Sequence, residues 1–323
     1  MRIHGSAISP RSISGSSGTL LAGLGVLCFS LSFPATAWAL SGGDGFGPWT
    51  VTGLRGVLAA LAAGVCLIRA RVPVPARQHW PALAVVALGC VVGFPLLTTL
   101  ALRISTTAHS AVVVGLLPLA TAVVAAARGR TQLTGVFWCA AGVGAAAVAG
   151  FAVAQSGGRP GLGDLFLVGA LLVCAAGYAE GGRLARRMPG WQVIAWGVVA
   201  ALPVTLLVSV PALALEPVHL TARSVSGLLY LAAVSQFGGF VLWYRGMAAV
   251  GVPRASQLQL AQPLLTLLWS VLLLRESLPP LALLTATLVV GCIALTQWAG
   301  RDGRRQLRVS VAGRRIPNGG QAD

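Results

Sequence analysis

The sequence predicts an all-α integral membrane protein with ten transmembrane helices in two inverted five-helix repeats. Three observations support this fold class: an apolar composition, ten long apolar stretches and a repeat in the proline positions. Hydrophobic residues make up 56% of the 323-residue chain and charged residues only 9%, with a mean hydropathy of +0.83. Because a soluble domain has about 25% charged residues, this composition argues against a soluble enzyme and against a nucleic-acid-binding protein.

Each apolar stretch is long enough for a helix that crosses a bilayer, which needs about 20 apolar residues. Backbone groups inside lipid must find their partners within the segment, so each stretch is expected to be helical. In chain order, the stretches cover residues 18–40, 49–70, 80–102, 106–127, 132–154, 162–182, 191–211, 224–244, 254–274 and 278–298.

Short segments rich in Gly, Pro or Arg separate the stretches and are expected to be loops. Examples are SGGDGFGP at 41–48, RARVPVPAR at 69–77 and QSGGRPG at 155–161. The first stretch also has features of a cleavable signal peptide, because Arg2 and Arg11 precede an apolar run that ends at Ala39. We expect this stretch to be retained, because it has a counterpart in the second half of the chain.

The basic residues predict the orientation in the membrane. All 23 are arginines; with a cytoplasmic N-terminus, 18 fall in cytoplasmic segments, 4 in external segments, and Arg55 within a span. Cytoplasmic loops of membrane proteins carry an excess of Lys and Arg. We therefore expect a multi-pass protein of the cell membrane with both termini in the cytoplasm. These ends are a segment at 1–17 and a basic tail at 300–323 that lies near anionic membrane lipids.

The two halves of the chain repeat one another. HSAVVVGLLPL at 109–119 aligns with RASQLQLAQPL at 254–264, which places Pro118 and Pro263 at a separation of 145 positions. The same separation relates Gly18 to Gly163 at the start of spans 1 and 6. Each repeat, 18–154 and 162–299, holds five spans. Because five is odd, the second repeat enters the membrane in the opposite orientation, as in transporters with a substrate site where the halves meet.

Three passages resemble the drug/metabolite transporter superfamily and, within it, the EamA family of ten-helix permeases. They are ALRISTTAHSAVVVGLLPLATAVV, GDLFLVGALLVCAAGYAEGGRLARR and WYRGMAAVGVPRASQLQLAQPLLTLLWSVLLLRESL. Pro118 and Pro263 match the family's prolines in spans 4 and 9. Glu276 matches the Glu of its Gly-Glu ending to span 9, with Arg275 in place of the Gly. The resemblance implies a permease that exports metabolites, often amino acids or related compounds.

Polar and aromatic residues in spans 8 and 9 are candidates for a substrate site. Amides are costly when they face lipid, so they are expected either to line a cavity or to form hydrogen bonds between helices. Trp and Tyr have a further alternative, a place in the aromatic belt at the membrane interface. The candidates are Gln236, Trp243, Tyr244, Gln257, Gln259 and Gln262.

Arg55 and Glu180 are charged residues within predicted spans. Arg55 could bind a substrate carboxylate through its planar guanidinium group, or it could extend to the outer interface. Glu180 is a candidate for proton coupling; the alternative is an ion pair with Arg183 at the cytoplasmic end of span 6. Pro118 and Pro263 interrupt backbone hydrogen bonding, and are candidate hinges or fixed kinks. His109 is expected to be a satisfied interfacial residue.

We expect no metal ion, disulfide or cofactor. Six cysteines lie singly in apolar runs, and no phosphate-binding loop or nucleophile–His–acid set is present in the sequence. The expected partners are a small-molecule substrate and membrane lipids, with no nucleic acid, and the protein is expected to be a monomer or homodimer. The sequence thus favours a secondary transporter over two alternatives: a multidrug or cation exporter of the same superfamily, and a membrane-embedded lipid enzyme.

Overall fold

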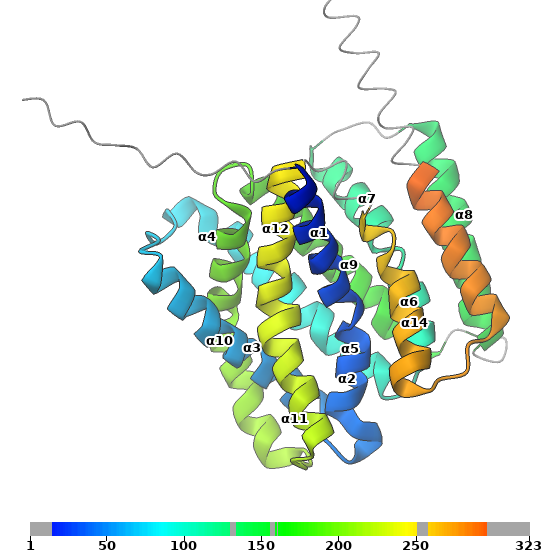
Figure 1. The fold of residues 1–323 in the computed structure, drawn as a ribbon, viewed down its shortest axis with the longest axis horizontal. Helices are drawn as coiled ribbons and strands as arrows, with labels where there is room; N and C mark the ends of the chain where they lie inside the picture. The colour runs from blue at the N-terminus through cyan, green and yellow to red at the C-terminus, as the bar shows by residue number, and fades with distance from the viewer. Residues whose placement is uncertain (1–14, 130–133, 156–158, 160, 251–257, 296–323) are drawn as a thin grey trace, which may run out of the picture.

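The computed structural model describes residues 15–129, 134–155, 159, 161–250 and 258–295, and these residues form one helical bundle (Figure 1). Within these described ranges, eight helical segments are long and apolar enough to cross a membrane, and two further apolar helices are shorter. The eight are Ser16–Leu40, Pro48–Arg69, Arg77–Leu102, Thr107–Arg128, Gly135–Gln155, Leu162–Leu184, Gly190–Leu215 and Ala222–Met247, and the shorter two are Gln262–Leu274 and Pro280–Leu295. The prediction of an all-helical membrane protein is confirmed, and eight of its helical segments have the length expected of a span.

Several of the long segments consist of two or more helical pieces. Besides the helix Pro280–Leu295, the described α-helices are α1 (Gly15–Ser30), α2 (Ser32–Leu40), α3 (Pro48–Arg69), α4 (Trp80–Val86), α5 (Phe94–Leu102), α6 (Thr107–Val114), α7 (Leu117–Gly129), α8 (Gly135–Gln155), α9 (Leu162–Leu184), α10 (Gly190–Leu215), α11 (Ala222–Leu229), α12 (Gly239–Val250) and α14 (Gln262–Leu274). Short 3₁₀ turns cover η1 (Ser41–Gly43) and η2 (Arg77–His79), and π-helical segments cover η3 (Ala87–Gly93) and η4 (Tyr230–Gly238).

The interruptions repeat along the chain with the same spacing as the prolines. Turns at Gly115–Leu116 and at Leu260–Ala261 are separated by 145 positions, as are Pro118 and Pro263 just after them. Proline lacks an N–H and leaves the carbonyl of the residue four positions earlier without its helical partner, which explains both breaks. Shifted by the same spacing, η3 falls within η4. The two halves therefore share helix breaks as well as sequence.

Close helix packing depends on small residues. Gly53 and Gly56 of α3 lie against Ser209 and Thr205 of α10, and a Cβ at either glycine would overlap those side chains. Gly25 of α1 similarly lies against α12. In membranes, such small residues let helix backbones approach closely and gain van der Waals contact.

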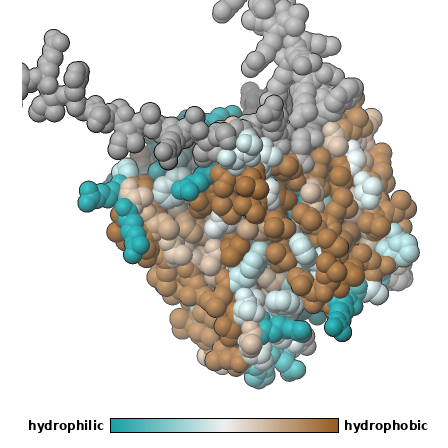
Figure 2. All heavy atoms as spheres, in the orientation of Figure 1, coloured by the Kyte–Doolittle hydropathy of each residue, from teal (hydrophilic) through white to brown (hydrophobic). Residues whose placement is uncertain are grey.

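Apolar side chains cover much of the bundle's outer surface. Figure 2 shows hydrophobic residues over the broad middle of one face and hydrophilic residues mainly at its edges. Leu207 of α10 is 74% exposed and Ile68 of α3 is 77% exposed. Because a large contiguous apolar surface is rare on a soluble monomer, this surface is the one expected to face lipid.

Candidate functional site

The first membrane segment is broken at Leu31, between α1 and α2. Pro34 has no N–H to donate to the carbonyl of Ser30, four residues earlier. That carbonyl instead accepts a hydrogen bond from Thr266 Oγ1 of α14 at 2.9 Å, and Trp269 Nε1 donates to Ser30 Oγ at 2.9 Å. The break thus places polar groups of a first-half helix against a second-half helix, an arrangement typical of transporter binding sites.

Arg55 of α3 lies buried next to this break. Arg55 is only 6% exposed, and its Nη2 donates a hydrogen bond to Ser235 Oγ in η4 at 3.4 Å. Ser235 Oγ also forms a hydrogen bond with Ser32 Oγ of α2, at 2.7 Å. The alternative in which Arg55 extends to the interface is therefore wrong, because the neighbouring helices enclose the guanidinium group.

The guanidinium group of Arg55 has unused hydrogen-bonding capacity. Its buried Nε has no hydrogen-bond partner, and none of the ion pairs among the described residues includes Arg55. A buried charge without a counter-ion is costly unless a ligand or water supplies the missing partner. We call the residues that join this arginine to the break the Arg55 cluster: Ser30, Ser32, Arg55, Ser235, Thr266 and Trp269.

Gln236 lies next to the cluster and is 2% exposed. Its Nε2 donates to the carbonyl oxygen of Cys90 at 3.5 Å, which joins η4 to η3. The amide thus ties together the two π-helical segments, one from each half. This contact fits the interhelical alternative given for the polar residues, and it leaves a role for Gln236 in substrate binding as a prediction.

The glutamines of span 9 are only partly described. Gln262 begins α14 and is half-buried, one helical turn before Thr266 of the Arg55 cluster, so both side chains share a helix face. Gln259 is also half-buried. Gln257 lies outside the described residues. A substrate-binding role for these amides remains a prediction.

Trp243 and Tyr244 of α12 pack inside the bundle. Trp243 is 9% exposed, lies against Gly25 of α1 and belongs to an apolar cluster with Ala22 and Val26. Tyr244 stacks on Phe240 with ring centroids 6.3 Å apart. The alternative of an interfacial aromatic belt is wrong for Trp243, because α1 covers its ring.

Glu180 of α9 is held by two arginines. Its Oε2 lies 2.7 Å from Arg183 Nη2, the pair expected at this spacing, and its Oε1 pairs with Arg128 of α7. Each carboxylate oxygen therefore has a guanidinium partner. These contacts fit the structural alternative, and a proton-carrying role for Glu180 remains a prediction.

His109 of α6 has a buried partner that the sequence did not reveal. Its Nε2 lies 2.7 Å from Asp164 Oδ1 of α9, and its ring stacks on Phe151 of α8. The expectation of a satisfied histidine is confirmed. Asp164 was missed as its partner because the two residues are 55 positions apart.

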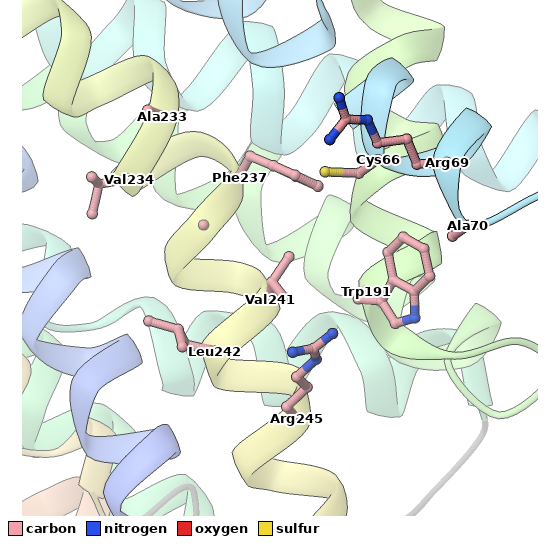
Figure 3. A pocket seen from close by; sticks show the side chains of 11 residues that line it. Cys66, Arg69, Ala70, Trp191, Ala233, Val234, Phe237, Val241, Leu242 and Arg245 are labelled. Carbon is pink, nitrogen blue, oxygen red and sulfur yellow. The ribbon is translucent and has the colours of Figure 1, made fainter. Parts of the chain in front are cut away.

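A cavity of about 690 Å³ is lined by none of the predicted site residues and by no member of the Arg55 cluster, although Ala233 and Val234 in its lining directly precede Ser235. Arg69 of α3, Trp191 of α10 and Arg245 of α12 border it, with apolar residues of η4 and α12 between them (Figure 3). Arg69 follows Arg55 by 14 residues on the same helix, so their Cα atoms are about 21 Å apart along its axis. The cavity thus lies near the opposite end of α3.

The described part of the chain contains no group of three or more His, Cys, Asp or Glu side chains that could hold a metal ion. All six cysteines fall within that part and are free thiols.

Long apolar helices, an apolar outer surface and two repeats with matching breaks define a polytopic membrane protein. The model of the EamA-like transporter family matches residues 16–153 and again 161–298, and the chain belongs to this family. The chain is 43% identical over 274 residues to an uncharacterized transporter, YdeK, of Bacillus subtilis (strain 168); the match covers 84% of this chain and 93% of YdeK.

The fold is also found in a crystal structure of a protein that shares 22% sequence identity with this chain. The TM-score is 0.60, and the alignment covers 88% of this chain and 99% of the other. The family indicated by the sequence motifs is thus confirmed, and the chain is a multi-pass membrane transporter with two EamA repeats.

Proposed function

We propose that this protein is a secondary transporter that exports small metabolites bearing a carboxylate, such as amino acids or related compounds. Transport occurs by alternating access between two inverted five-helix repeats. The observation that carries this proposal is the buried guanidinium group of Arg55 at the break in the first span. The family supports transport in general, and Arg55 supports the choice of substrate.

A substrate carboxylate supplies what Arg55 lacks. The planar guanidinium group can donate two parallel hydrogen bonds to a carboxylate, and the buried Nε is free to be one of the donors. The hydroxyl groups of Ser32 and Ser235 lie beside it for the other polar groups of a small solute. A cationic substrate is disfavoured, because Asp164 and Glu180 are each bonded to a basic side chain that it would have to displace.

The shared helix breaks support two repeats of opposite orientation. Each repeat contributes five helical passes if the shorter helices Gln262–Leu274 and Pro280–Leu295 also cross the membrane. The Arg55 cluster contains residues of both repeats, with Arg55 and Ser32 from the first and Ser235 and Thr266 from the second. In this class of transporter, a site between the repeats becomes accessible from each side in turn.

The arginine distribution supports a location in the cell membrane with both termini in the cytoplasm. In this orientation the cavity with Arg69 and Arg245 lies toward the cytoplasm. Two guanidinium groups there raise the local concentration of an anionic substrate before it reaches Arg55.

The test is efflux from cells that express the protein after loading with labelled amino acids. Wild-type cells are expected to export at least one amino acid but not its amide, in which the carboxylate is replaced. The Arg55→Gln variant should lose export at normal membrane abundance. Arg103→Gln, which changes an exposed arginine, is the matched control. Equal export of acid and amide, unaffected by Arg55→Gln, would contradict the proposal.

A further inference from the structure

Glu216 joins the end of α10 to the beginning of α3. It is the C-terminal cap of α10, and its carboxylate accepts hydrogen bonds from two consecutive backbone N–H groups in the first turn of α3. Thr50 N donates to Oε2 at 2.8 Å and Trp49 N to Oε1 at 3.3 Å. Gly47 makes this approach possible, because a Cβ there would overlap the carboxylate.

Glu276 makes the same kind of contact between α14 and α6. Thr107 N donates to its Oε1 at 3.0 Å and Ala108 N to its Oε2 at 3.0 Å. Arg275 ends α14 in the left-handed region with φ of 56°, and this turn directs Glu276 toward α6. Here too, a carboxylate from the second repeat caps the first turn of a helix from the first repeat.

In both contacts, the helix that is capped and the helix that provides the carboxylate are counterparts in the two repeats. Shifted by 145 positions, the start of α3 falls within α10, and the segment of α6 and α7 falls on the segment that ends with α14. Both contacts lie at the end of the bundle where α2 packs on α11 (Figure 1), which we call the α2–α11 end.

Two more links between the repeats lie at the α2–α11 end. Asp164 of the second repeat binds His109 of the first, two residues beyond Thr107. The loop before α3 pairs with the loop after α10 through an isolated antiparallel bridge between Phe46 and Val218, and His219 N donates to the carbonyl of Gly45 at 3.1 Å. Four separate contacts therefore hold the two repeats together at this end.

The opposite end lacks carboxylates at the equivalent positions. The counterparts of Glu216 and Glu276 are Arg71 and Thr131, which have no carboxylate. Among the described residues, the ion pair between the repeats at that end joins Glu180 to Arg128, and the arginine side chain is 47% exposed while that of Glu180 is 13% exposed. An exposed pair of this kind contributes little to stability, whereas a carboxylate on two helix N-terminal N–H groups forms charge-assisted bonds and opposes the helix dipole.

We propose that Glu216 and Glu276 form the gate at the α2–α11 end, holding the two repeats closed there and releasing α3 and α6 when the transporter opens. The inference rests on the alternating access of the proposed function. In the proposed orientation the gate faces the outside, so its opening is the step that releases substrate from the cell. Glu216 and Glu276 are positioning residues in this cycle, since neither lies in the Arg55 cluster.

Distance measurements between spin labels on the full chain in lipid nanodiscs test the gate. All six cysteines are first replaced by alanine. Label pairs then join exposed residues of the two repeats at the α2–α11 end, Asp44 with Leu220 and Ile104 with Ser277. The labelled protein that keeps both glutamates should show mainly the short distances of the closed form for both label pairs. Glu216→Gln and Glu276→Gln, which keep side-chain size, should each raise the ratio of open to closed forms about tenfold.

Two further variants keep the result interpretable. Gly47→Ala leaves both glutamates in place but displaces the Glu216 carboxylate, and should lengthen the Asp44–Leu220 distance specifically. Glu180→Gln, at the opposite end, should leave both distances unchanged. Unchanged distances in the doubly substituted Glu216→Gln/Glu276→Gln protein, or equal lengthening in Glu180→Gln, would overturn the gate.

Failure of the gate can be distinguished from failure of the proposed function. Longer distances together with normal export by Arg55→Gln would retain the gate and reject the substrate site. Loss of export in Arg55→Gln with unchanged distances in the glutamate variants would retain the substrate site and reject the gate.

Discussion

Ser235 connects the buried arginine to the break in the first span, because its hydroxyl bonds both Arg55 Nη2 and Ser32 Oγ. Ser235→Ala removes this connection and leaves Arg55 free to move. We expect the KM for the exported substrate to rise about threefold at normal abundance, since an interhelical hydrogen bond in a membrane contributes about 0.6 kcal/mol. Efflux kinetics check this, with the exposed Ser226→Ala as control. An unchanged KM would place the substrate away from Ser235.

Glu180 provides a second prediction at the level of single residues. Its two arginine partners hold the carboxylate at one end of α9, so we expect Glu180→Gln to retain concentrative export driven by an ion gradient. Because both arginines are about half exposed, the loss of stability should be less than about 1 kcal/mol. Transport assays in energised and de-energised vesicles measure this. If Glu180→Gln abolishes concentrative transport but keeps exchange, Glu180 is the coupling residue after all.

At the level of helices, the break at Leu31 makes a quantitative prediction. Thr266→Val removes the hydroxyl that donates to the Ser30 carbonyl, and should lower the free energy of unfolding by about 1–2 kcal/mol, the cost of a buried unsatisfied acceptor. Pro34→Ala restores an N–H that can donate to the same carbonyl along a regular helix. The Thr266→Val penalty should therefore be smaller in the Pro34→Ala background.

A double-mutant cycle on thermal unfolding in detergent measures this coupling. Equal penalties for Thr266→Val in the two backgrounds would show that Pro34 does not cause the break. Transport assays on the same four proteins show whether the break is also needed for function. A regular first helix should impair export even where stability is regained, because it moves Ser32 relative to Arg55.

The sequence indicated the helix breaks at Pro118 and Pro263 but not the break before Pro34, although a missing proline N–H explains all three. Pro118 and Pro263 each remove an N–H, and the structure interrupts both helices just before them. The π-helical segments η3 and η4 were not predicted, because no single residue type specifies them. Their role as hinges, and that of the prolines, remains a prediction.

The site was harder to predict than the spans, because its contacts join distant parts of the chain. Arg55 and Ser235 are 180 positions apart, and Ser30 and Thr266 are 236 apart. Hydropathy places each residue within a span but not the face it presents to its neighbours. For the same reason, the sequence did not indicate that Glu216 and Glu276 each bind the first turn of a distant helix.

At the scale of the whole molecule, the number of passes determines where the end of the chain lies. Alkaline phosphatase is active only outside the cytoplasm, so fusions report the side of each loop. With the proposed orientation, a fusion at Asp44 should be active, and fusions at Arg186 and after Asp323 should be inactive. These three results are the same for eight passes and for ten, because both numbers are even.

A fusion at Ser277 distinguishes a protein with eight passes from one with ten. Ser277 lies between the shorter helices Gln262–Leu274 and Pro280–Leu295, so it is external only if both helices cross the membrane. We expect it to be active, because Glu276 beside it binds the first turn of α6, at the same end of the bundle as the Asp44 loop. An inactive fusion at Ser277 with an active one at Asp44 would leave eight passes and place Glu276 on the cytoplasmic side. The two repeats would then differ in their number of passes, and the inverted arrangement on which alternating access depends would be wrong.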